Sequence, residues 1–148
     1  AKGVDQAAIE AAAGGLTVGI PAEGINVVSR RSAIRQLVHD GQLCIASPYA
    51  PGARFSAGTA MGRNKIIYAL STVAFVASAD RDSGGTWTGA VETLKRGWCP
   101  VTTWTGPGAR DGNTGLVDKG AHAITQVDQI FDPALLEAQP KPPRPTLF

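Results

Sequence analysis

A Rossmann-like α/β fold, built as a three-layer sandwich around a mostly parallel sheet, is the fold class that this sequence predicts. Short apolar runs alternate with amphipathic segments of about ten residues along most of the chain. Such alternation implies right-handed βαβ units, in which each helix returns the chain to a parallel strand. The length of 148 residues, with 43% hydrophobic and 18% charged residues, suits one globular domain with one core. We place this domain at residues 1–135 and a proline-rich tail at residues 136–148.

The first half of the chain is predicted to alternate helix and strand twice. Glycine commonly ends a helix, and Gly14 and Gly41 stand where two amphipathic patterns stop. Ser29 or Ser32 is expected to cap the second of these helices. The expected elements are a helix over 4–15, a strand and turn over 16–24, a helix over 29–41, a buried strand over 42–47 and a long loop over 48–62.

The second half continues the alternation. The run VAFVAS favours a buried strand, and the β-branched residues of CPVTTW favour another. The expected elements are a helix over 63–71, a strand over 73–78, a helix beginning near Thr86, a strand over 99–104, a short helix and an edge strand within 105–124, and a terminal helix over 127–138.

The start of the chain departs from the usual order of an open α/β sheet. Residue 1 directly precedes a helix, whereas such a sheet normally begins with a strand that leads into the first ligand-binding turn. We therefore expect the sheet to lack its first strand or strands, either because the chain is a fragment or because those strands come from elsewhere.

Several kinds of protein are disfavoured by what the sequence lacks. No apolar stretch reaches the roughly 18 to 20 residues that span a bilayer, and no leader pattern is seen, so we expect a cytoplasmic protein without membrane contact. Cys44 and Cys99 lie in short apolar runs, which predicts two reduced, buried cysteines. His39 and His122 are expected to be structural, and no metal site is predicted. With a formal charge of only +2, any contact with nucleic acid must use a local patch.

A basic turn at the start of the 63–71 helix is the first candidate anion site. Arg63, Asn64 and Lys65 offer a guanidinium, an amide and an ammonium where a loop is expected to become a helix. Because helix N-termini carry unpaired N–H groups and partial positive charge, these side chains are predicted to converge on one phosphate. A capped helix with solvated charges is the alternative interpretation.

A glycine-rich turn after the VAFVAS strand is the second candidate site. Ser83, Gly84, Gly85, Thr86 and Thr88 offer N–H groups and hydroxyls at the carboxyl end of a strand, where open α/β sheets bind ligands. The turn has neither the dinucleotide pattern GxGxxG nor the GK[ST] ending of a P-loop, so no nucleotide cofactor is predicted. A plain strand-to-helix turn is the alternative.

Trp87 and two carboxylates complete this candidate site. Trp87 lies within the glycine-rich turn and is expected to be exposed there, where its ring would stack on a base. Asp80 and Glu92 are the nearest carboxylates, and either is a candidate general acid or base. No catalytic triad and no metal-ligand spacing accompanies them.

Five blocks of the chain carry a resemblance to a known family. Four of them are AKGVDQAAIEAAAGG, SPYAPGARFSAGTAMGRNKIIYALS, VAFVASADRDSGGTWTGAVETLKRGWCPVTTW and GNTGLVDKGAHAI, and the fifth, LTVGIPAEGIN, resembles the strand and turn that follow the first. In this order and spacing they resemble the DNA-processing protein A family (DprA, also called Smf), whose marks include F…RN-(R/K)-II-x-LS and a closing N-x-GL-x-x-GA element. The turn SGGTWTGA, where most members have a form nearer SGSLxTA, resembles the DprA-like branch.

The resemblance implies a function and a set of site residues. Members of this family have an extended Rossmann-like domain that dimerises, binds single-stranded DNA and loads a RecA-type recombinase during natural transformation or related DNA repair. By resemblance, the phosphate pocket falls on Lys2 and Gly3, on Arg63, Asn64 and Lys65, and on the Ser83–Thr86 turn. We therefore predict a non-enzymatic, homodimeric binder of single-stranded DNA, in which Lys2, Arg63, Lys65 and the Ser83–Thr88 turn hold the backbone.

Two other interpretations remain open from the sequence. Nucleoside-monophosphate phosphoribohydrolases of the LOG group have a similar helix, strand and PGGxGTxxE turn, with Arg63 and Glu92 as the corresponding catalytic pair. Here Trp87 replaces a glycine of that turn, and Glu92 is shifted by one residue, which rotates it by about 100° on a helix. The third interpretation is an assembly module whose missing strands a partner chain supplies.

Overall fold

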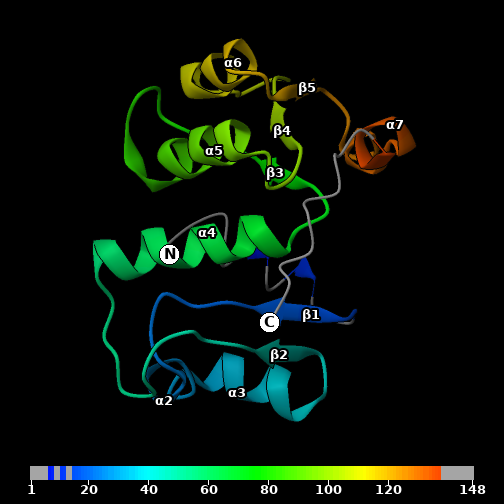
Figure 1. Cartoon of the computed structure of the whole chain (residues 1–148). Helices are drawn as coiled ribbons and strands as arrows, with labels where there is room; N and C mark the ends of the chain where they lie inside the picture. The colour runs from blue at the N-terminus through cyan, green and yellow to red at the C-terminus, as the bar shows by residue number, and fades with distance from the viewer. Residues whose placement is uncertain (1–6, 9–10, 13–14, 138–148) are drawn as a thin grey trace, which may run out of the picture. The chain divides into compact units, whose positions relative to one another are not determined.

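A computed structural model describes residues 7–8, 11–12 and 15–137 of the chain (Figure 1). The chain divides into two compact units, Ala1–Arg63 and Asn64–Phe148. Every strand of the described residues pairs in parallel with its neighbour, which confirms the predicted parallel arrangement. Among the described residues, no helix is long and apolar enough to cross a membrane. Of the predicted helix over 4–15, only residues 7, 8, 11 and 12 are described, and Gly14 lies outside the described residues.

The first unit contains a two-stranded sheet and the helices that connect its strands. Strand β1 (Thr17–Gly19) is followed by α2 (Ile25–Val28), α3 (Ser32–His39) and β2 (Leu43–Ile45). Both strands were predicted, whereas the short helix α2 was not. The unit buries few apolar side chains, among them those of Val28 and Leu43.

The predicted serine caps of α3 are wrong. Arg31 is the N-cap residue of α3 and makes no side-chain capping bond, while Ser29 instead ends α2 and Ser32 is the first helical residue. The guanidinium of Arg31 pairs with the carboxylate of Glu23 at 2.8 Å. Gly41 follows α3 with a φ of 71°, so the predicted glycine stop is confirmed.

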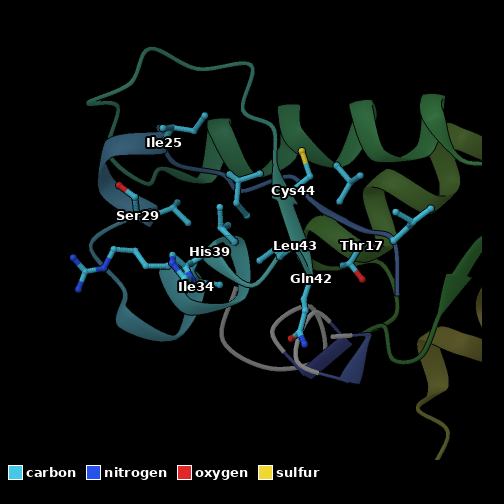
Figure 2. A pocket seen from close by; sticks show the side chains of 15 residues that line it. Thr17, Ile25, Ser29, Ile34, His39, Gln42, Leu43 and Cys44 are labelled. Carbon is cyan, nitrogen blue, oxygen red and sulfur yellow. The ribbon is translucent and has the colours of Figure 1, made fainter. Parts of the chain in front are cut away.

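An apolar pocket of about 830 Å³ occupies the first unit. Figure 2 shows its lining side chains, which come from β1, α2, α3 and β2 and their flanks. Val18 and Cys44 are partners in the strand register, and both line this pocket. Cys44 is therefore exposed, and the expectation that it is buried is wrong.

The two cysteines are expected to differ sharply in reactivity. Cys99 is buried in the second unit as predicted, and its burial raises the pKa of the thiol to about 11. Because the thiolate is the reactive form, Cys44 should react rapidly with a disulfide reagent such as DTNB at pH 8, and Cys99 only after unfolding. Counting the thionitrobenzoate that DTNB releases with and without denaturant, for the unmodified chain and for Cys44→Ser, tests this expectation. Reaction of both cysteines in the folded chain would contradict it.

Helix α4 (Ala57–Leu70) begins six residues earlier than predicted. The N–H of Thr59 donates to Oγ of Ser56 at 3.0 Å, and the N–H of Ser56 donates to Oγ1 of Thr59 at 2.9 Å. This reciprocal pair satisfies two N–H donors at the start of the helix, so the helix begins directly after Ser56. The Gly-Arg-Asn-Lys segment consequently lies in the helix interior, and the prediction that it opens a helix is wrong.

The second unit is built around a three-stranded parallel sheet in the order β3 (Ala74–Val76), β4 (Val101–Trp104) and β5 (His122–Ile124). Helix α5 (Gly84–Arg96) connects β3 to β4, and α6 (Asp111–Asp118) connects β4 to β5 (Figure 1). The three strands, α5 and the edge position of β5 agree with the sequence prediction. The core comprises Tyr68, Ala74, Val76, Ala79, Trp87, Ala90, Cys99, Val101, Leu116 and Ala121.

The predicted terminal helix over 127–138 is interrupted. A 3₁₀ helix η1 (Val127–Phe131) precedes α7 (Pro133–Glu137), and Asp132 separates them with an extended ψ of 121°. Proline lacks an N–H group and disfavours a helical conformation in the residue before it, so Pro133 starts a new helix.

Candidate functional site

Residues Asp80–Thr86 comprise the turn that follows β3 and the first three residues of α5, and they have a tight and unusual backbone conformation. We call this segment the α5 turn. Asp80 and Ser83 form an antiparallel bridge, and the N–H of Ser83 lies 3.4 Å from the carbonyl of Asp80. Asp82 has a φ of 54° and Gly84 a φ of 78°, in the region that favours glycine. The turn thus reverses the chain directly into α5 at the carboxyl end of β3.

The start of α5 is exposed, and its first N–H groups carry no side-chain cap. Ser83 is the N-cap residue, with an extended backbone, and makes no side-chain capping hydrogen bond. Residues Ser83–Thr86 and Thr88 are all exposed, and the first turn holds no acidic residue. Exposed N–H groups at the positive end of a helix are suited to an anionic oxygen.

Asn64 and Tyr68 of α4 pack against α5 at two glycines. A Cβ atom added to Gly85 would lie 3.7 Å from Nδ2 of Asn64, and one added to Gly89 would lie 2.9 Å from Cε2 of Tyr68. The two helices therefore approach closely through small residues four positions apart. This packing places the amide of Asn64 beside the first turn of α5, so the structure brings Asn64 and the α5 turn together as predicted.

Lys65 contacts α5 about two helical turns further along. Its Nζ lies 3.0 Å from Oε2 of Glu92, and Nε of Arg96 lies 3.0 Å from Oε1 of the same carboxylate. The hydrogen bond from Lys65 is the main cause that holds the pKa of Glu92 below its usual value, so Glu92 is ionised at neutral pH. Lys65 nevertheless keeps 49% of its side-chain surface exposed. The Lys65 side chain can therefore be approached by a second anion.

The predicted convergence of Arg63, Asn64 and Lys65 on one phosphate is wrong. Arg63 is 7% exposed, and its Nη1 donates to the carbonyl of Ile20 at 3.2 Å, directly after β1. Successive residues inside a helix point about 100° apart, so three in a row do not share a direction. The structure gives them three different surroundings: a main-chain carbonyl, the first turn of α5, and Glu92.

The expectation that Trp87 is exposed is also wrong. Trp87 is 7% exposed and belongs to the core of the second unit. Its ring would lie 2.9 Å from a Cβ added to Gly115 of α6, so it is tightly enclosed. The predicted site residues Lys2 and Gly3 lie outside the described residues.

Two arginines near the α5 turn were not singled out by the sequence. Nη1 of Arg110 donates to Oδ1 of Asp80, and Nη2 of Arg81 donates to Oδ2 of Asp118 at 3.1 Å. They link the α5 turn to the residues at the start and end of α6. The sequence does not reveal either pair, because the partners are 30 and 37 residues apart along the chain. Within the described part of the chain, no group of three or more metal-ligating side chains is present.

Comparisons with known proteins identify the family. The sequence profile of the family described as DNA recombination-mediator protein A matches residues 1–134. This chain belongs to that family. No curated protein matches it. Among solved structures, it is similar to DNA processing protein A (DprA) from Streptococcus pneumoniae, with 28% sequence identity and a TM-score of 0.73.

The likeness to the pneumococcal structure covers 88% of this chain and 48% of that one, so the chain spans about half the length of its solved relative. It confirms the predicted Rossmann-like α/β fold. Membership of the recombination-mediator family also confirms the resemblance stated from the sequence, and it favours DNA processing over the phosphoribohydrolase interpretation.

Proposed function

We propose that the chain is a single-stranded DNA-binding, non-enzymatic recombination mediator of the DprA type that acts in the cytoplasm. One observation carries the proposal: in a chain of the recombination-mediator family, the exposed first turn of α5 presents N–H groups that no side chain caps. These groups suit the phosphate oxygens that a DNA backbone offers at regular spacing.

The proposed contacts are the accessible members of the predicted set. Ser83, Gly84, Gly85 and Thr86 provide N–H groups and hydroxyls, and Thr88 lies exposed in the next turn. Asn64 lies beside Gly85, and Lys65 adds the ammonium of a half-exposed side chain. Arg63 is assigned a structural part because its guanidinium is buried against the carbonyl of Ile20. Trp87 is likewise left out of the proposed contacts.

If the chain binds the DNA backbone in this way, its affinity for DNA should fall as the salt concentration rises. Each neutralised phosphate releases counterions, so two contacts should weaken binding about five- to tenfold between about 50 and about 200 mM salt. Fluorescence-anisotropy titration of a labelled oligothymidine measures this, and an oligonucleotide of mixed sequence should give the same affinity. Absence of binding by the folded chain, or binding indifferent to salt, would contradict the proposal.

Recombinase loading and a homodimeric state belong to the same proposal. Both are supported by the family to which the chain belongs. Sedimentation equilibrium of the chain should show a mass near twice 15.3 kDa. Addition of the chain to a RecA-type recombinase on coated single strands should shorten the lag of filament formation. A monomer at all concentrations would contradict the homodimer, and an unchanged lag would contradict recombinase loading.

Replacement of Glu92 should strengthen DNA binding rather than abolish it. In Glu92→Gln the ammonium of Lys65 loses its charged partner but keeps its position, and one negative charge leaves the side of α5. We expect the affinity for oligothymidine to rise about two- to fivefold. Asp128→Asn, which removes the same charge from η1, serves as the control and should change affinity less. Weaker binding by Glu92→Gln would show that Lys65 does not contact the DNA.

A further inference from the structure

Asn113 of α6 uses its side-chain amide to hold two segments of main chain. The side chain is fully buried. Its Oδ1 accepts the N–H of Ala79 at 2.8 Å, and its Nδ2 donates to the carbonyls of Ala77 at 3.0 Å and Trp104 at 2.8 Å. Both N–H groups and one oxygen lone pair of the amide are therefore in use.

These bonds begin where the sheet ends. The pairing of β3 with β4 stops at Val76 and Thr103, so the polar groups of Ala77 and Ala79 lie beyond the last pair of the sheet. Asn113 supplies the partners that a neighbouring strand would otherwise give. A buried main-chain N–H or carbonyl without a partner is costly, so the amide fixes the path along which the chain leaves β3.

Glycines next to Asn113 allow α6 to come this close. A Cβ atom added to Gly112 would lie 2.2 Å from the carbonyl oxygen of Ala79. A Cβ added to Gly115 would lie 2.9 Å from the ring of Trp87, in the first turn of α5. Helix α6 thus contacts the residue before the α5 turn and the residue after it.

We propose that Asn113 is a positioning residue for the α5 turn. It sets the conformation in which the N–H groups of Gly84, Gly85 and Thr86 point to solvent together, although it is itself buried and touches no ligand. The part of this inference that concerns DNA rests on the proposed function. Sequence position alone does not suggest it, since Asn113 is 34 residues from Ala79.

The test compares two variants of Asn113 with a control that also removes a buried hydrogen bond from the same unit. Asn113→Ser removes the amide, and Asn113→Thr replaces it with one hydroxyl on a side chain that fills more of the site. Thr102→Val is the control, because Oγ1 of Thr102 donates to the carbonyl of Ala74 at the far end of β3. Hydrogen exchange, read by mass spectrometry on peptides covering 77–88, and oligothymidine affinity are measured for each folded protein.

We expect the hydrogen-bonded amides of residues 77–88, among them that of Ser83 in the α5 turn, to exchange at least about tenfold faster in Asn113→Ser than in Thr102→Val, when the two are matched for global stability. The dissociation constant for oligothymidine should rise at least about fivefold in the Asn113 variant and stay within about twofold in the control. Asn113→Thr should change both quantities in the same direction, and it provides the measurement should Asn113→Ser not fold.

Two results would overturn the inference. One is exchange in the α5 turn that rises no more than in the control. The other is equal DNA affinity of the Asn113 variants and the control. If the unmodified chain fails to bind DNA, the proposed function falls, and the exchange measurement alone decides whether Asn113 positions the turn.

Discussion

Gly85→Asp is expected to weaken binding of single-stranded DNA about tenfold or more while leaving the chain at least as stable. Gly85 is exposed, has no positive φ, and a Cβ at this position would meet only Nδ2 of Asn64 at an ordinary 3.7 Å. A carboxylate in the first turn favours the helix and replaces a flexible glycine, a gain of about 0.5 to 1 kcal/mol in the free energy of unfolding. The same carboxylate repels phosphate, and a tenfold loss corresponds to about 1.4 kcal/mol.

The opposite signs of the two effects make this variant informative. A variant that simply damages the fold would lower both stability and affinity. Gly85→Asn has the same shape without the charge, so its affinity should stay within about twofold of the unmodified chain. Anisotropy titration and thermal unfolding of the three proteins give both quantities. Unchanged affinity in Gly85→Asp would remove the α5 turn from the DNA interface.

Trp87→Ala is expected to lose about 3 to 5 kcal/mol of the free energy of unfolding, because it empties a large buried site. Trp87 packs in the core of the second unit with Ala79, Ala90 and Leu116, against Gly115 of α6. A loss of this size should lower the melting temperature by about 10 °C or more. Circular dichroism during heating, or denaturant titration, measures the change.

Trp87→Phe distinguishes a structural role of Trp87 in the core from a role in stacking on a base. Phenylalanine fills most of the site, so the variant should stay folded at 20 °C and bind oligothymidine with nearly unchanged affinity. Trp98 is half-buried beneath the guanidinium of Arg96, so Trp98→Phe serves as a comparison variant for Trp87→Phe. Full stability of Trp87→Ala together with weakened DNA binding would reinstate an exposed, stacking tryptophan.

Local patterns were sufficient for the strands and for the C-terminal ends of α3 and α4. The apolar runs QLCIAS, VAFVAS and CPVTTW each contain a strand, because burial of consecutive apolar residues in a parallel sheet leaves a signature within one short segment. The exposure of Cys44 was missed because it depends on what covers the sheet. That information lies in other parts of the chain.

Two errors at the site had signals in the sequence. Ser56 and Thr59 stand three residues apart, the spacing at which a serine and a polar residue cap each other, and this marks the true start of α4. Trp87, Ala90, Val91 and Leu94 follow the spacing of one helix face, which places the tryptophan on the core side of α5. Ser56 and Thr59 were instead assigned to the long loop over 48–62, and Trp87 to an exposed anion-binding turn.

The partners of Asn113, Arg81 and Arg110 had no such signal. Their bonds to Ala79, Asp118 and Asp80 join residues at least 30 positions apart in the second unit. A single sequence gives the presence of these side chains but not which residues the fold brings to them. The position of the α5 turn was therefore predicted, while the residues that shape it came only from the structure.

The most direct test of this account is a two-dimensional amide NMR titration of the ¹⁵N-labelled 15.3 kDa chain with oligothymidine. The largest shifts should fall on Gly84, Gly85 and Thr86, with smaller ones at Asn64 and Lys65, and raised salt should reduce all of them together. Residues of the apolar pocket, such as Val18 and Cys44, should stay unchanged. Saturable binding that leaves the α5 turn unshifted and moves other residues would contradict the claim that this turn holds the DNA backbone.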